Sequence, residues 1–337
     1  IIGGKGHKAY NILDSRRRVR LYDRERDAWY GDTARLRARL SKDSANTAFV
    51  PTDLYNTTMP LVTAAINADD GLYLGLGALR TGRRGFRRTP YSSRQKILVS
   101  HSFSTEAFNV KFSSEWIHAL GTADIVVDGE ARAPNNTQNF FGRGNQTLFD
   151  KTGDYKRYYR TRFNLYDITT ALRWRGGKGS SLVVGPSFEY YHYDADDNKG
   201  RFTQQVSMIG SYDSATIASD RAHLGLEATY TLDQRNDEML PAYGAYVRVG
   251  AAAFTGLNGA SRSFVKLSPE LALYKSLTGR QNVVLAERIG GEVSFGHTAF
   301  YQSAFLGGEG NLLGYRKYRF AGQQSLYNNA EIRVRLA

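Results

Sequence analysis

The residues able to carry chemistry are scattered along this chain rather than gathered in motifs. The histidines show no metal-ligand spacing with one another or with a carboxylate, so a metal site is not expected. No G-x-S-x-G elbow marks a nucleophilic serine. The absence of cysteine excludes thiol catalysis, disulfides and zinc–thiolate sites. The histidines are His7, His101, His118, His192, His223 and His297.

Two glycine-rich stretches are similar to phosphate loops but lack their spacing. GGKG at residues 3–6 and GGKGSS at residues 176–181 do not complete the G-x-x-x-x-G-K-S/T pattern. The second stretch predicts a tight turn between two strands. We therefore expect no enzymatic activity, no cofactor and no bound metal in these residues.

The net charge of +13 suggests nucleic acid as a first partner class. The cations, however, are spread along many alternating segments, with local clusters at residues 16–20 and 80–88. No helix-turn-helix, RNP-like or zinc-finger pattern accompanies them. Nucleic acid is therefore not an expected partner.

Polar and apolar residues alternate in segment after segment from Met59 onward, as in strands with one wet and one apolar face. In residues 108–116, Phe108 and Phe112 lie on one face, and Lys111 and Glu115 lie on the other. Residues 71–79, 123–131, 223–232 and 331–336 alternate in the same way. The 34 glycines, 22 tyrosines and 17 phenylalanines, with only 7 prolines, favour an all-β fold with many tight turns.

A soluble β-sandwich shows the same alternation of polar and apolar residues, so strand length and link length must distinguish it from a membrane barrel. The strands run for about 9–12 residues, enough for a tilted strand to cross a bilayer. Short and long links alternate, and no apolar run reaches the roughly 18 residues of a membrane helix. About twelve strands fit before Leu336. We predict a transmembrane antiparallel β-barrel at residues 56–337, preceded at residues 1–55 by a periplasmic segment or the tail of an upstream domain.

The charged faces of these strands would line the wet interior of the barrel. The charges are of both signs, as they would also be in a porin. A porin and a plugged barrel therefore differ in whether a loop fills the interior. The stretch GGEGNLLGYRKYRFAG (residues 307–322) has the glycines, aromatic residues and arginines that a loop filling a polar interior needs. The expected wall charges are Asp124, Asp128, Glu130, Arg160, Arg162, Glu227, Arg248, Glu331, Arg333 and Arg335.

Four stretches resemble the BamA/TamA-type superfamily of outer-membrane assembly barrels, also called bacterial surface antigen barrels. Residues 66–94 are similar to its opening strands and turns, and NFFGRGNQT (residues 139–147) is similar to a third extracellular loop. DQRNDEMLPAYGAYVRV (residues 233–249) resembles its periplasmic turn, with Asp233, Arg235, Pro241 and Gly244 in place. Residues 307–322 resemble its long sixth extracellular loop.

The resemblance implies a sixteen-stranded barrel, so the last four strands are expected to be missing from this chain. In that family the sixth loop folds into the lumen, and an arginine beside a glycine and an aromatic residue packs on the inner wall. Here the tip is Leu313-Gly314-Tyr315, with Leu313 where the arginine is expected. Arg316 or Arg319 would replace it.

The first residues are similar to a different segment. IIGGKGHKAYNI, followed by RLYD, resembles the junction between a periplasmic calcineurin-like phosphoesterase and such a barrel in Bacteroidetes-type fusions. The chain carries no phosphoesterase metal-ligand motif, so the resemblance assigns no catalysis to these residues. It implies a possible phosphoesterase domain upstream.

The resemblance implies outer-membrane protein insertion, or polypeptide translocation, in the outer membrane of a Gram-negative bacterium. The first strand, residues 60–68, would form one side of a lateral seam at Leu61, Val62, Thr63 and Ala64. Expected partners are outer-membrane lipid including lipopolysaccharide, unfolded outer-membrane protein clients or a passenger polypeptide, and periplasmic or lipoprotein accessory subunits. The arginine-rich residues 80–94 fit lipid phosphates or a docking partner. A passive channel and a membrane anchor for a phosphoesterase are the alternatives.

Overall fold

The computed structural model describes residues 2–3, 8–9, 19–24, 29–30, 36–42, 46–48, 55–67, 71–85, 88, 90–210, 213, 215–279 and 281–335. The chain forms two compact units, residues 1–57 with 81–93 and residues 58–80 with 94–337. In the first unit, β1 (Lys8–Ala9) pairs in parallel with β3 (Trp29–Tyr30), and β2 (Val19–Asp23) with β4 (Leu36–Leu40). The assignment of residues 1–55 to a periplasmic segment or the tail of an upstream domain stays a prediction.

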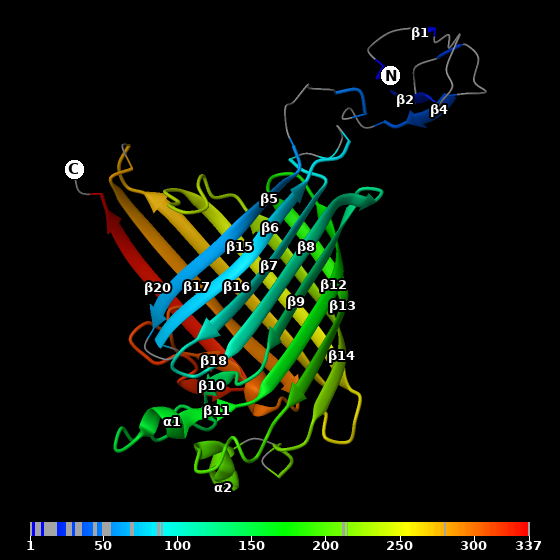
Figure 1. Cartoon of the computed structure of the whole chain (residues 1–337). Coiled ribbons are helices and arrows are strands. Elements are labelled where there is room, and N and C mark those ends of the chain that lie inside the picture. The colour runs from blue at the N-terminus through cyan, green and yellow to red at the C-terminus, as the bar shows by residue number, and fades with distance from the viewer. Residues whose placement is uncertain are drawn as a thin grey trace. The chain divides into compact units, whose positions relative to one another are not determined.

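The second unit is dominated by one twelve-stranded sheet in which sequence neighbours are also spatial neighbours (Figure 1). The paired strands are antiparallel, which confirms the predicted all-β barrel architecture. Within the described residues the sheet is curved but not closed, and β5 and β20 are its two ends. Its strands are β5 (Thr57–Asn67), β6 (Gly71–Gly82), β7 (Ser93–Ser102), β8 (Phe108–Leu120), β9 (Ala123–Arg132), β12 (Asn164–Arg175), β13 (Ser180–His192), β14 (Arg221–Asp233), β15 (Gly244–Gly256), β16 (Phe264–Ser276), β17 (Val283–Gly296) and β20 (Gln324–Val334).

Long and short connections sort to opposite ends of the sheet because successive strands run in opposite directions. One end, the turn rim, has the connections 83–92, 121–122, 176–179, 234–243 and 277–282. The other end, the loop rim, has the connections 68–70, 103–107, 133–163, 193–220, 257–263 and 297–323, of which residues 68–70 lie outside the described residues. The three long ones are loop three (133–163), loop four (193–220) and loop six (297–323). The sequence stretches 139–147 and 307–322 thus lie in the third and sixth loops, as predicted.

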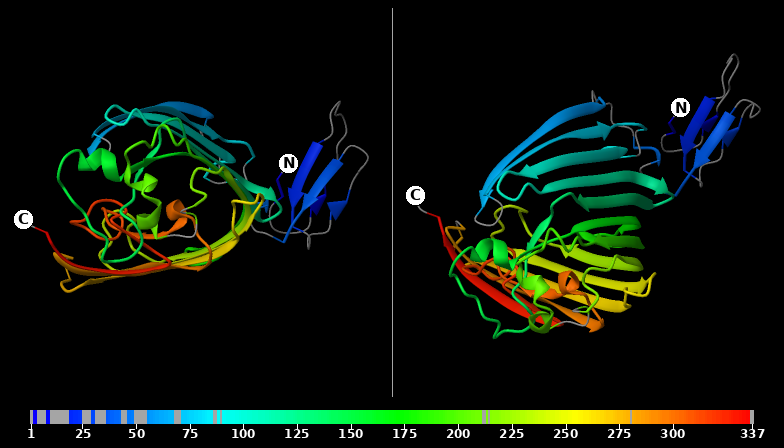
Figure 2. Two further views of the ribbon diagram at one scale, coloured as in Figure 1. Left: turned by 90° about the horizontal axis from the view of Figure 1, so that it is seen from below. Right: turned by 60° about the horizontal axis from the view of Figure 1, so that its bottom comes forward.

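The long loops carry short elements of their own. Viewed from the loop rim, these elements lie within the curve of the sheet (Figure 2, left). Among the described residues, no helix is long and apolar enough to cross a membrane. The elements are β10 (Thr137–Asn139), α1 (Tyr155–Tyr159) and β11 (Arg160–Arg162) in loop three, η2 (Phe202–Gln204) and α2 (Val206–Ile209) in loop four, and η3 (Phe300–Gln302), β18 (Ala304–Leu306) and β19 (Phe320–Gly322) in loop six.

The strand register separates an apolar outer face from a charged inner face. Asp167 on β12 lies opposite Glu130 on β9 and Glu189 on β13, all on the inner side. Ile168, the next residue, lies opposite Phe188 on the outer side, where both side chains are exposed. Because side chains alternate along a strand, this one register fixes the faces of the whole sheet.

The main buried core lies among the loops at the loop rim rather than between two sheets. It joins loops three, four and six to the first inner-face residues of the strands that carry them. We call these three loops, together with this core, the loop plug. Its buried members are Phe140, Phe141, Tyr159, Phe163, Leu165, Tyr191, Tyr193, Phe202, Ile209, Ile217, Ala299, Phe300, Tyr301 and Ala321.

Candidate functional site

A charge network occupies the inner wall towards the turn rim. Asp124, one of the predicted wall charges, is 1% exposed and accepts from Arg173 at 3.0 Å and from Arg175 at 2.9 Å. Arg173 also binds Glu115 at 2.5 Å, so two strands of the wall are tied to a third. A cavity of about 450 Å³ adjoins this network and is lined by Asp128 and by Leu61 of β5.

A second group of charges lies across β8, β9 and β12. Glu130 receives hydrogen bonds or ion pairs from Asn109 at 2.6 Å and from Lys111 at 3.3 Å. Arg132 lies 3.5 Å from the carboxylate of Asp167. The described residues contain no group of three or more His, Cys, Asp or Glu side chains that could hold a metal ion. The wall groups are therefore paired mainly with one another across strands.

The remaining predicted wall charges fall in two places. Glu227 and Arg248 line an interior cavity of about 380 Å³ below the loop plug. On the last strand, Glu331 and Arg333 form an ion pair at 2.9 Å, and Arg335 follows that strand. Leu336, expected to end the last strand, lies outside the described residues.

Arg160 and Arg162 are not on the wall, which corrects the expectation for these two residues. They lie on β11, a three-residue strand of loop three that pairs with β10. Alternation in Arg160–Thr161–Arg162 resembles that of a wall strand, but Phe163 separates β11 from β12. A period of two cannot tell which sheet a segment joins.

Several charged residues of the interior were missed by the sequence reasoning. Asp167, Arg173 and Arg175 alternate along NLYDITTALRWR, so the same period-two signal could have found them. Arg221 and Asp213 gave no such signal. Their pairing depends on how loop four folds back on β14, which a local pattern does not show.

The loop plug is fixed to the wall by buried polar contacts. Arg221, at the start of β14, and Asp213 of loop four are both fully buried and lie 3.4 Å apart. The rings of Tyr191 on β13 and Tyr301 on η3 stack in parallel at 4.5 Å. Gln302 donates to the wall carboxylate of Glu189 at 2.6 Å. These contacts join loops four and six to β13 and β14.

Arg319 joins loop six to loop three. Its guanidinium donates to the hydroxyl and to the carbonyl of Thr147, each at 2.6 Å. The same group lies over the rings of Phe141 at 5.1 Å and Phe320 at 4.7 Å. Burial lowers the pKa of Arg319, although an arginine stays charged in proteins. Arg319, one of the two arginines proposed from the sequence, thus makes these contacts with loop three and with its own neighbour Phe320.

The predicted tip of loop six lies beside these contacts. Gly314 has a φ of +85°, a left-handed conformation that suits glycine. Leu313 and Tyr315 are exposed, and the ring of Tyr315 packs on Phe320 at 5.2 Å. Arg316 lies 5.4 Å from the ring of Tyr155 in loop three.

Loop six also reaches the inner wall just before its tip. Asn329 on β20 donates to the carbonyl of Asn311 at 3.2 Å, and Arg288 on β17 donates to the carbonyl of Gly310. Leu313 lines a small cavity with these wall residues. The loop thus folds back onto the inner face of the last two strands.

The predicted seam residues lie on β5, an end strand of the sheet. Leu61 lines the interior cavity, so Leu61 and Thr63 face inward and Val62 and Ala64 face outward. The strand begins at Thr57, earlier than predicted, and Pro60 lies inside it. An end strand tolerates proline because the missing N–H can face the unpaired side.

The twelve-stranded antiparallel sheet, with an apolar outside, a charged inside and loops packed at one rim, defines a barrel of the outer-membrane type. A scan against family models agrees, since residues 95–334 match the Omp85 superfamily domain. This match covers more than half of the chain, and the chain belongs to the Omp85 superfamily. It is an outer-membrane protein of a Gram-negative bacterium, and its apolar outer face contacts membrane lipid.

A solved structure supports the fold. The crystal structure of BamA from Haemophilus ducreyi lacking POTRA domains 1–3 aligns with a TM-score of 0.55 at 14% identity. The alignment covers 78% of this chain and 46% of that one, so the chain spans less than half of the BamA structure it matches. At this identity the likeness concerns the fold alone. A search of curated proteins found no match.

Proposed function

We propose that this barrel inserts outer-membrane proteins, or translocates a polypeptide, through a lateral seam at β5. The observation that carries the proposal is that β5, the first strand of the sheet, contains Pro60 and so offers one backbone N–H fewer for pairing with its neighbours. A strand whose pairing is weakened in this way opens more readily. The unpaired N–H and C=O groups of such a strand are a template on which an incoming strand adds. The resemblance to assembly barrels favours the same function.

The loop plug supports a lateral path. Loops three, four and six pack around one aromatic core, and loop six folds back onto the inner wall. A polypeptide entering the interior would meet this packed core at the loop rim. An exit along β5 avoids the core altogether.

Photo-crosslinking in cells tests the seam. A photoreactive amino acid at Val62, which is 75% exposed on the outer face of β5, is placed in the full-length protein. The control carries it at Ile168, which is 49% exposed on the outer face of β12, a strand paired on both sides. We expect adducts with unfolded outer-membrane proteins at Val62 and only lipid at Ile168. Equal amounts of protein adducts at both positions would reject the seam. So would the absence of adducts at Val62 under conditions in which unfolded outer-membrane proteins are present in excess.

A passive channel is the second candidate, and the polar cavities below the plug favour it. They are lined by charged side chains and have volumes of about 380 and 450 Å³. Steady conductance of the full-length protein in planar bilayers, without client adducts at Val62, would replace the first proposal by this one. A role as membrane anchor for an upstream phosphoesterase stays a prediction, and we propose no catalytic role for these residues.

A further inference from the structure

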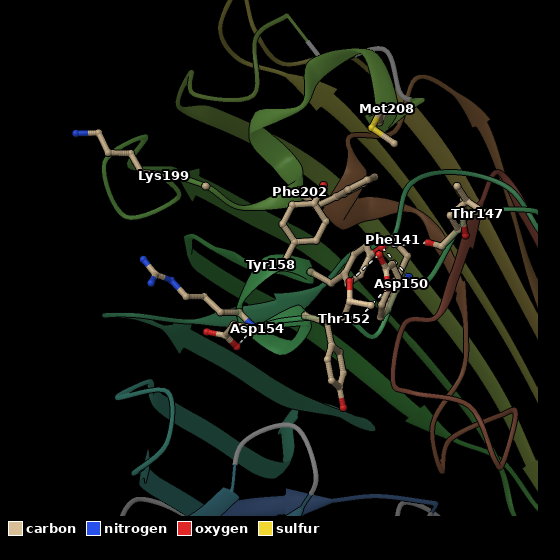
Figure 3. A pocket seen from close by; sticks show the side chains of 14 residues that line it. Phe141, Thr147, Asp150, Thr152, Asp154, Tyr158, Lys199, Phe202 and Met208 are labelled. Carbon is tan, nitrogen blue, oxygen red and sulfur yellow. Dashed lines mark hydrogen bonds between the residues drawn. The ribbon is translucent and has the colours of Figure 1, made fainter.

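A large cavity opens on the outside of the loop plug, between loops three and four (Figure 3). Its volume is about 850 Å³. Aromatic side chains of both loops line it, and none of them belongs to the seam or to the inner wall. They are Phe141, Tyr155, Tyr158, Tyr159 and Phe202.

The aromatic lining rests on a packed base, in which Phe141, Tyr159 and Phe202 are each at most 5% exposed. Tyr159 packs against Phe141 at 4.8 Å and Phe202 at 5.6 Å, and its hydroxyl bridges the backbone of Asp150 and Leu148. Tyr155 and Tyr158 are only partly buried. No hydrogen bond within the described residues engages either of their hydroxyls, so both are available to a ligand.

One side of the pocket is cationic. Arg157 lines it, together with Lys199, which is in an exposed ion pair with Asp196 at 2.8 Å. Behind them Arg201 donates to the carbonyls of Arg157 and Arg160 at 2.9 and 2.8 Å. Burial lowers the pKa of Arg201, and the nearby charges of Arg162, Arg157 and Arg160 lower it further. Arginines therefore crowd this side of the pocket.

Two carboxylates also line the pocket, and each accepts hydrogen bonds from its own neighbours. Asp150 accepts from the backbone and the hydroxyl of Thr152 at 2.8 and 2.9 Å. Asp154 accepts from the backbone of Arg157 at 3.3 Å. The guanidinium of Arg157 would offer an anionic ligand charge-assisted hydrogen bonds.

We propose that this pocket binds a phosphorylated saccharide, namely the core sugars of lipopolysaccharide in the surrounding outer leaflet. The partly exposed rings of Tyr155 and Tyr158 would contact the sugars, their free hydroxyls would bind sugar hydroxyls, and Arg157 would bind phosphate. Long loops of outer-membrane barrels face the cell exterior, where these sugars are exposed. The volume is that of a small-ligand site, whereas an extended polypeptide needs a longer groove.

The test measures binding to purified full-length protein in detergent. The probe is the phosphorylated core oligosaccharide released from lipopolysaccharide, compared with the same oligosaccharide after dephosphorylation and with inorganic phosphate. Arg157→Gln removes the phosphate contact, and Tyr158→Ala removes an aromatic face. Arg262→Gln is the matched control, an exposed arginine of the connection 257–263 at the same rim that does not line the pocket. Retention of the heat-modifiable folded form verifies that each variant is folded.

We expect Arg157→Gln to weaken binding about 10-fold, the worth of one charge-assisted hydrogen bond, and Arg262→Gln less than about 2-fold. Dephosphorylation of the oligosaccharide should weaken its binding to the parent protein by the same factor, and Arg157→Gln should then have no further effect. Tyr158→Ala should weaken binding of both oligosaccharides. Equal binding of the two oligosaccharides, or equal effects of the two arginine variants, would overturn the proposal. Tighter binding of an acidic, tyrosine-containing peptide would replace the saccharide by a peptide. Competition by inorganic phosphate as strong as that by the oligosaccharide would reduce the site to a phosphate site. None of these outcomes depends on whether the seam at β5 opens.

Discussion

Arg319 is expected to hold loop six against loop three, and Arg319→Ala is the change that exposes this role. The variant loses two hydrogen bonds to Thr147, each 2.6 Å long, and the stacking of the guanidinium on the rings of Phe141 and Phe320. It also leaves the Thr147 carbonyl without this donor. The chain segments involved lie far apart in sequence, so no local contact replaces the lost one.

The size of the effect follows from these contacts. A hydrogen bond from a charged donor contributes about 1.5 kcal/mol at the low end, and a partly exposed cation–π contact about 0.5–1 kcal/mol. Low values apply because Arg319 is only partly buried. The two hydrogen bonds alone then amount to about 3 kcal/mol, or roughly a 100-fold change in a local opening equilibrium, and the stacking adds to this.

Hydrogen exchange reports this opening directly. The amide of Gly144 donates to the carbonyl of Ala321 at 2.8 Å, which links loop three to loop six. In Arg319→Ala, the peptide covering residues 139–149 should exchange about 100 times faster, while strand peptides of the sheet stay unchanged. Lys317→Ala is the control, because the Lys317 side chain lies over the ring of its neighbour Tyr318 and makes no hydrogen bond or ion pair within the described residues. Unchanged exchange in Arg319→Ala, or equal acceleration in both variants, would refute the reasoning.

Two further predictions concern loop four. Asp213→Asn removes the carboxylate from a fully buried ion pair with Arg221, so urea titration in lipid vesicles should show a loss of about 3–5 kcal/mol in the free energy of unfolding. Asp196→Asn, in the exposed pair with Lys199, should change it by less than about 1 kcal/mol. Tyr190→Phe removes the hydroxyl that donates to Asp220 at 2.6 Å, the main cause of the lowered pKa of Asp220. Because the pKa of Asp220 is lower in the folded than in the unfolded protein, its ionised form stabilises the fold at pH values above the unfolded pKa of about 4. This stabilisation is lost as the pH falls through the folded-state pKa. The variant should therefore be less stable than the parent at pH 6 and indistinguishable from it near pH 2, and a difference that persists at the lower pH would contradict this explanation.

The faces of the sheet could be predicted from the sequence because alternation is a local property of a strand. Asp124 and Glu130 face inward, as expected, and Ile125 and Val127 between them face outward. The rim at which each loop lies was predictable for a similar reason, because successive antiparallel strands place successive connections at alternate ends of the sheet. Glycine-rich residues 176–181 form the expected turn, with Gly179 at a φ of +77°.

The loop plug could not be predicted because its contacts join distant segments. Nothing near Arg319 indicates Thr147, and nothing near Asp213 indicates that Arg221 is buried beside it. The assignment of Arg160 and Arg162 was wrong for the opposite reason. A loop strand of three residues has the same alternation as a wall strand, and only its hydrogen-bond partner distinguishes the two.

The shared core of loops three, four and six has a consequence for antibodies and other binders. At the loop rim, three separate stretches of chain are held together by rings such as Phe141, Phe202 and Phe300. Epitopes at this rim are therefore discontinuous. An antibody raised against a synthetic peptide of one loop would recognise the unfolded chain, whereas one selected on the folded protein would lose its target when any of the three loops is exchanged alone.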